Sequence, residues 1–82
     1  MITELDTVVL RNDLPEHGLR AGDVGTVMLV HRGGEGFEVE FVALDGETVA
    51  VASLFSSQVR PIERQEITHA RKVEGAFAFG PA

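Results

Sequence analysis

The stretch from Ala21 to Phe41, AGDVGTVMLVHRGGEGFEVEF, predicts two antiparallel strands joined by a glycine-rich turn. Residues 37–41 alternate apolar and acidic side chains without an error, and a period of two is typical of a half-buried strand. The residues expected to face the core are Phe37, Val39 and Phe41. Glycines within residues 33–36 can adopt the positive φ angles that tight hairpin turns require.

The first strand of this hairpin is predicted over residues 24–31, which are rich in β-branched and long apolar side chains. Strict alternation places Val27 and Leu29 on one face and Met28 and Val30 on the other. Gly25 is the expected position of a bulge or sharp bend that lets a short sheet curl.

Further strands are predicted on both sides of this hairpin. Residues 5–11 form the first strand, and residues 12–23 form a long folded loop held to the sheet by Leu14 and Leu19. The Asp45-Gly46 pair between two apolar runs indicates another hairpin. The remaining elements are expected as a strand at 48–52, a single 3₁₀ turn at 54–58 and a short strand at 59–62.

This order of elements predicts an all-β fold, a small five-stranded SH3-like β-barrel formed by residues 1–62. Residues 63–82 are predicted to form a C-terminal tail. Residues 63–73 could form a short helix, although their apolar stripe is thin, and an extended segment would follow.

Composition limits the class of protein. The chain has 82 residues, enough for one domain, and it has no cysteine, which agrees with a cytoplasmic location. No leader sequence or membrane-spanning segment is recognisable. Seven basic and thirteen acidic residues give a net charge of −6, which opposes the binding of nucleic acid. A cluster of arginines in space would offset this argument.

The motif Gly22-Asp23-Val24-Gly25-Thr26-Val27, preceded by an apolar strand and a loop, resembles the Gly-x-x-Gly-x-Val core of the KOW motif. KOW barrels occur in ribosomal proteins and transcription factors, so this resemblance implies nucleic-acid binding. The basic loop residues of such domains are sparse here, with only Arg20 before Gly22.

A longer resemblance is to an uncharacterised bacterial family of small domains. It extends from residue 3 to about residue 62, and the similar segments are residues 4–10, 13–19, 22–27, 37–41, 45–51 and 58–61. That family has no assigned activity and no known catalytic residues, so the resemblance implies the limits of the domain and no function.

Aromatic residues in the tail are the most distinctive candidates for partner binding. Phe77 and Phe79 would lie on one face of an extended segment, which could add as a strand to the sheet edge of another copy. The alternatives are docking within the same chain and a frayed tail. The other candidate partner-binding residues are Phe55, His17 and Arg60.

No motif indicates a catalytic, cofactor or metal site. The three histidines, His17, His31 and His69, are far apart in the sequence, and no cysteine accompanies them. Glu38 and Glu40 share a strand face, but both are expected to face water, where nothing separates their pKa values. The serines lack a nucleophile elbow, and Ser56 and Ser57 are expected to cap the 3₁₀ turn.

The sequence therefore favours a non-enzymatic module that binds a protein partner or a second copy of itself, using the loop at 12–23, the turn at 54–58 and the tail. Two alternatives stay open. One is a nucleic-acid-binding KOW-like barrel, and the other is an accessory subunit of a bacterial enzyme complex.

Overall fold

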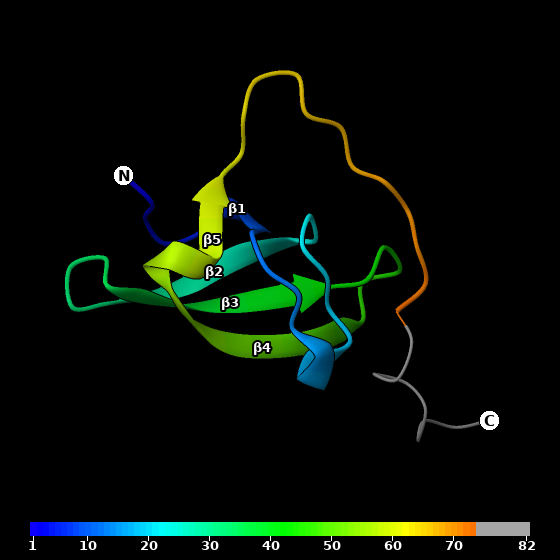
Figure 1. The fold of residues 1–82 in the computed structure, drawn as a ribbon, viewed down its shortest axis with the longest axis horizontal. Helices are drawn as coiled ribbons and strands as arrows, with labels where there is room; N and C mark the ends of the chain where they lie inside the picture. The colour runs from blue at the N-terminus through cyan, green and yellow to red at the C-terminus, as the bar shows by residue number, and fades with distance from the viewer. Residues whose placement is uncertain (74–82) are drawn as a thin grey trace.

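The protein forms one antiparallel sheet of five strands in the computed structural model, which describes residues 1–73 (Figure 1). The strands are β1 (Thr7–Leu10), β2 (Val24–His31), β3 (Gly36–Val42), β4 (Thr48–Phe55) and β5 (Val59–Pro61). Two 3₁₀ helices, η1 (Pro15–His17) and η2 (Ser56–Gln58), connect them. The all-β class is confirmed. Among the described residues, no helix is long and apolar enough to cross a membrane.

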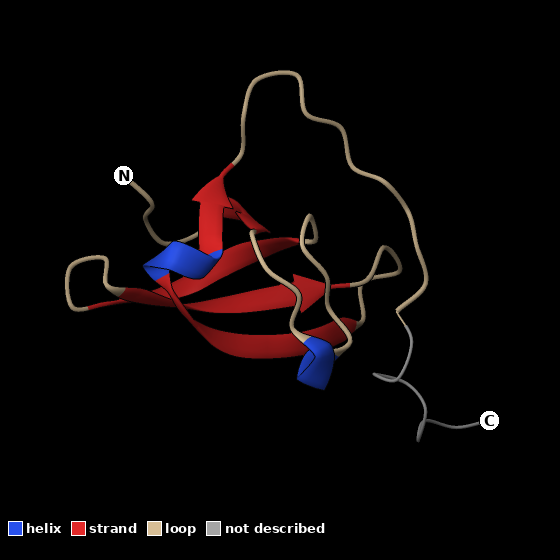
Figure 2. Ribbon diagram, viewed as in Figure 1, coloured by secondary structure: helices blue, strands red, loops and turns tan. Residues whose placement is uncertain are grey.

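The spatial order of the strands is β4-β3-β2-β1-β5, so the last strand returns to pair with the first. The sheet curls, so that its two edge strands share one core. Leu54 of β4 and Val59 of β5 belong to the same buried cluster as residues of the central strands. No ladder joins β4 to β5 in the described residues, so the sheet is open and η2 connects its edges (Figure 2).

Strand β3 follows the predicted alternation. Phe37, Val39 and Phe41 are 3%, 0% and 2% exposed. Each pairs with a residue of β4 that also faces the core or packs against it, and these partners are Leu54, Ala52 and Ala50. These residues of the hairpin belong to the hydrophobic core or pack against it.

Strand β2 departs from strict alternation. Its pairing with β3 shifts between Val27 and Leu29, which places a bulge at Met28. Val27 and Val30 both face the core, whereas Met28 and Leu29 are 46% and 45% exposed. The prediction that Val27 and Leu29 share a face is wrong, because one extra residue moves every later side chain to the opposite face.

Gly25 is not the bulge. It pairs regularly with Val8, and a Cβ at this position would lie 2.6 Å from Val39 Cγ1 and 2.8 Å from Phe41 Cε1. The glycine is required because β2 passes closely over the core side chains of β3.

The long loop before β2 is held to the sheet as predicted. Leu14 and Leu19 are both buried and form an isolated bridge, with Leu14 N donating to Leu19 O (2.9 Å) and Leu19 N to Leu14 O (3.1 Å). η1 lies between them, and Gly18 closes it with a φ of 70°.

The segment after β5 has no helix over residues 62–73, so a helix there is wrong. Gln65 has a φ of 65°, which interrupts a right-handed helix, and Glu66 folds back to accept hydrogen bonds from Arg60 and from the Glu63 backbone. Residues 62–73 form an arc that leaves β5 and returns to the loop before β2 (Figure 1).

Candidate functional site

Strand β4 is a free edge of the sheet that residues 1–73 form. Its sequence, TVAVASLF, extends over eight residues and contains no proline and no charged residue. β5, at the opposite edge, has only three residues and ends at Pro61. Proteins usually protect an exposed edge with short strands, charges, proline or bulges. β4 has none of the first three, and the one register shift in its pairing with β3 lies near Thr48, before Val51. No other strand among residues 1–73 pairs with its outer side.

One hydrogen bond shows which backbone groups of β4 point away from β3. Ser56 N donates to Glu35 O (3.0 Å), and in an antiparallel ladder the residues bonded to the neighbouring strand alternate from there. Ala52 and Leu54 therefore bond to β3, while Val51 and Ser53 direct their N–H and C=O groups outward.

Phe55 agrees with this alternation of inward and outward backbone groups, and it marks the end of the free edge. Its N–H also points away from β3, and it is taken by the Gln58 Oε1 atom at 2.8 Å. Gln58, and not Ser56 or Ser57, thus caps η2, since neither serine makes a side-chain cap bond.

An open hollow of about 370 Å³ lies beside the end of β4. Phe55 and His31 are the two register partners of Gly36, one on each neighbouring strand, and the glycine places no side chain between them. Phe55 is 74% exposed. The other residues that line the hollow are Arg32, Glu35, Glu38, Ser53 and Leu54.

Glu38 links three strands at this hollow. Its Oε2 atom accepts a hydrogen bond from Ser53 Oγ of β4 (2.6 Å) and lies 2.8 Å from His31 Nε2 of β2. These two contacts, with that from Ser53 the larger, lower the pKa of Glu38 below its ordinary value. The carboxylate thus stays charged into more acidic solution.

Glu40 has a similar arrangement farther along β3. Its Oε2 atom accepts a hydrogen bond from the Thr48 hydroxyl of β4 at 2.8 Å. Both outward-facing carboxylates of β3 are therefore drawn toward the free edge by hydroxyl groups of β4. The arrangement can bind positive charge beside an unpaired strand.

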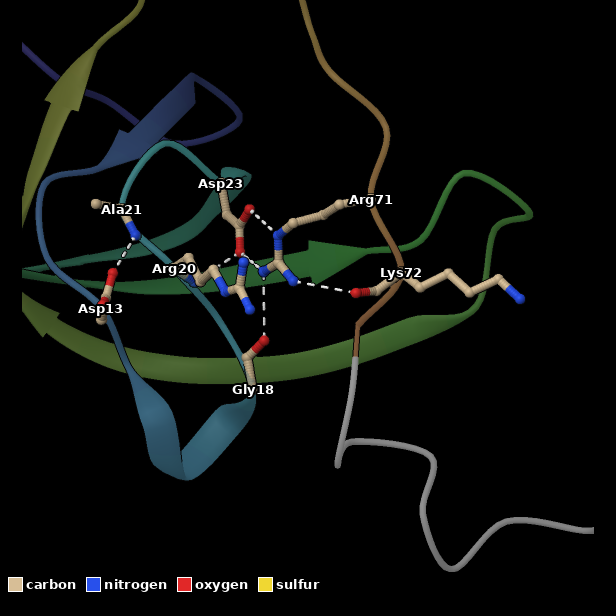
Figure 3. A network of polar contacts seen from close by, with 7 residues as sticks. All are labelled: Asp13, Gly18, Arg20, Ala21, Asp23, Arg71 and Lys72. Carbon is tan, nitrogen blue, oxygen red and sulfur yellow. Dashed lines mark hydrogen bonds and ion pairs between the residues drawn. The ribbon is translucent and has the colours of Figure 1, made fainter.

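A second polar network lies where residues 62–73 meet the loop before β2 (Figure 3). The Arg71 guanidinium pairs with the Asp23 carboxylate, with Nε 3.1 Å from Oδ1, and also reaches Gly18 O at 3.3 Å. Asp23 Oδ2 in turn accepts from Arg20 N at 2.8 Å. This network fastens the segment to the domain, so we assign it a structural role.

The structure separates the predicted partner-binding residues. Phe55 lines the hollow, whereas His17 belongs to η1, and the two 3₁₀ helices lie at opposite ends of the sheet (Figure 2). Arg60 lies in β5 and forms a fork with Glu66, with N–O distances of 3.0 and 2.6 Å. Phe77 and Phe79 lie outside the described residues.

Sequence reasoning missed the other members of the site. It placed Glu38 in water, found no site for His31 and gave Ser53 no role. The expectation that nothing distinguishes the two strand glutamates is wrong for Glu38, because Ser53 and His31 both contact its carboxylate. The Asp45-Gly46 turn indicated that β4 pairs with β3, but the register shifts between Phe41 and Val42, so the turn alone does not set the pairing of Ser53 with Glu38.

The arginines do not gather into one patch. Arg20 and Arg32 lie beyond opposite ends of β2, and the charge of Arg60 is balanced by Glu66. Nor does any group of three or more His, Cys, Asp or Glu residues in the range 1–73 have the arrangement needed to hold a metal ion.

A family described as a domain of unknown function (DUF4926) matches residues 4–61, most of the chain, which agrees with the family resemblance noted over residues 3–62. No curated protein and no solved structure matches the chain.

Proposed function

This chain belongs to the DUF4926 family of domains of unknown function, and we propose that it is a non-enzymatic protein-interaction module that accepts an extended segment of a partner as an additional strand on β4. The observation that carries this proposal is the free edge of β4, which is long and uncharged and has outward backbone groups at Val51 and Ser53. Strand addition uses such groups for affinity and neighbouring side-chain pockets for specificity.

The hollow beside Phe55 supplies the second requirement. Val51, Ser53 and Phe55 are every second residue of β4, so their side chains lie on the same outer face. A strand that pairs with Val51 and Ser53 therefore also lies beside Phe55. One of its side chains would then contact the exposed ring of Phe55. Burial of an aromatic ring is a common source of binding energy at protein interfaces.

The experiment is a selection of peptides from a random library on the full-length protein, followed by affinity measurements on two variants. Val51→Pro removes the outward N–H, whereas Val51→Ala removes side-chain atoms and keeps the N–H. We expect the selected peptides to bind Val51→Pro at least about tenfold more weakly, because a main-chain bond is lost and the proline ring obstructs the incoming strand.

Thermal unfolding and circular dichroism of both variants provide the control for folding. The proposal is contradicted if the selected peptides bind Val51→Pro as tightly as they bind the wild type, or if the library yields no binders. Peptides that protect the Val51 and Ser53 amides from hydrogen exchange support it.

A further inference from the structure

The outer face of β3, next to the free edge, carries the charge that a partner would meet. Glu38 is paired with Ser53 and Glu40 with Val51, the two residues whose backbone groups point outward. The domain as a whole has a net charge of −6. An incoming strand would therefore place its side chains directly beside two carboxylates.

The geometry selects long side chains. Adjacent strands lie about 4.8 Å apart, so the incoming strand would be about 10 Å from β3, with only Ser53 and Val51 between. Both side chains are short, so a long side chain from the incoming strand can extend past them across β4. Lysine and arginine can lay their methylene stems on such a surface and keep the charged group at its far end.

The carboxylates are already turned toward this approach. Ser53 Oγ of β4 holds Glu38 Oε2 at 2.6 Å, with His31 Nε2 of β2 at 2.8 Å from the same oxygen, and Thr48 Oγ1 of β4 holds Glu40 Oε2 at 2.8 Å. A carboxylate oxygen accepts more than one hydrogen bond, so each glutamate can receive a cation without losing its hydroxyl donor. The ring of Phe55 beside Ser53 offers a further surface for a guanidinium group.

From this arrangement, and resting on the proposed strand addition, we propose that the partner strand carries two basic side chains at alternate positions, one opposite Ser53 that reaches Glu38 and one opposite Val51 that reaches Glu40. The domain thus recognises a Lys/Arg-x-Lys/Arg pattern within an extended segment.

The test uses synthetic peptides of about eight residues, the length of β4. They share one alternating Thr/Val sequence and differ only at two alternate positions, which carry Lys, Gln or Glu. Binding to the full-length protein is measured by fluorescence anisotropy at low and at moderate salt. We expect the Lys peptide to bind roughly tenfold more tightly than the Gln peptide, because each exposed ion pair contributes modestly, and more tightly still than the Glu peptide.

Protein variants identify the groups responsible. In the double variant Glu38→Gln/Glu40→Gln the preference for Lys over Gln is expected to fall to about twofold or less. Glu16→Gln, one such substitution placed in η1 instead of on β3, is expected to retain it.

The outcomes separate the two proposals. Equal binding of all three peptides, lost in Val51→Pro, overturns the basic pattern and leaves strand addition intact. A Lys preference that survives in Val51→Pro overturns strand addition and shows attraction to an acidic surface alone. A Lys preference that survives in Glu38→Gln/Glu40→Gln, or no binding of any peptide, overturns the basic pattern.

Discussion

Gly25 shows how tightly single residues are constrained in this small core. An alanine Cβ would lie 2.6 Å from Val39 Cγ1 and 3.0 Å from the Glu40 carbonyl oxygen. We predict that Gly25→Ala lowers the free energy of unfolding by about 1–3 kcal/mol, because the core has to shift to admit the methyl group. Urea unfolding measures the loss.

A double variant identifies its cause. In Gly25→Ala/Val39→Ala the clashing Cγ1 is removed, so the combined loss should be smaller than the sum of the two single losses. Additive losses would contradict the steric explanation.

Glu66 gives a prediction for acidic pH. The hydrogen bonds from Arg60 and from the Glu63 backbone lower its pKa from 4.5 to about 2. Since the folded state favours the carboxylate, the stabilisation is fully present above 4.5 and is lost as the pH falls through about 2. Carboxyl NMR titration should report this pKa directly.

Removal of the arginine tests the assignment. In Arg60→Ala the pKa of Glu66 is expected to rise toward 4.5, because the hydrogen bond from Arg60 is the largest cause of the lowered pKa. Arg64→Ala, the same substitution four residues later in the chain, is expected to leave it low. A pKa of Glu66 that rises in Arg64→Ala and stays low in Arg60→Ala would show that the ion pair between Arg60 and Glu66 is absent in solution.

Whether a single residue could be predicted depended on the range of its contacts. The inward positions of Phe37, Val39 and Phe41 follow from local alternation and are confirmed. The contacts of Glu38 depend on two neighbouring strands and their register, which alternation within one strand does not contain. The site was therefore only partly predictable, through Phe55.

At the scale of elements, β4 should tolerate proline at one position and not at the next. In Val51→Pro the lost N–H points away from β3, so we expect a loss of about 1 kcal/mol or less of unfolding free energy. In Ala52→Pro the lost N–H bonds to β3, and we expect a loss of about 3 kcal/mol or more. Chemical unfolding of the two variants checks this, and similar losses would contradict the orientation of the strand.

The strands were predicted correctly where the turn residues and the alternation of apolar side chains indicated the same element. All five strands occur at their expected places, although β4 extends to Phe55 and β1 is limited to Thr7–Leu10. The bulge at Met28 was missed because no glycine or proline marks it. A helix at 63–73 was wrong because Glu66 bonds to Arg60 and to a backbone N–H, which favours a local turn.

At the scale of the whole molecule, charge separates the possible partners. The chain carries a net charge of −6, and the ion pairs of Arg60 with Glu66 and of Arg71 with Asp23 neutralise two arginines. We predict no binding to mixed-sequence RNA or DNA at low salt at protein concentrations up to about 100 μM. Fluorescence anisotropy measures this, and saturable binding that weakens with salt would instead support the KOW-like alternative.

Whether β4 is a free edge can be measured without any partner, by amide hydrogen exchange of the full-length protein followed by NMR. The outward amides of Val51 and Ser53 are predicted to exchange quickly, whereas those of Ala52 and Leu54, bonded to β3, exchange slowly. Slow exchange at all four amides would mean that another part of the chain, or a second copy, already covers this edge, and would contradict the account.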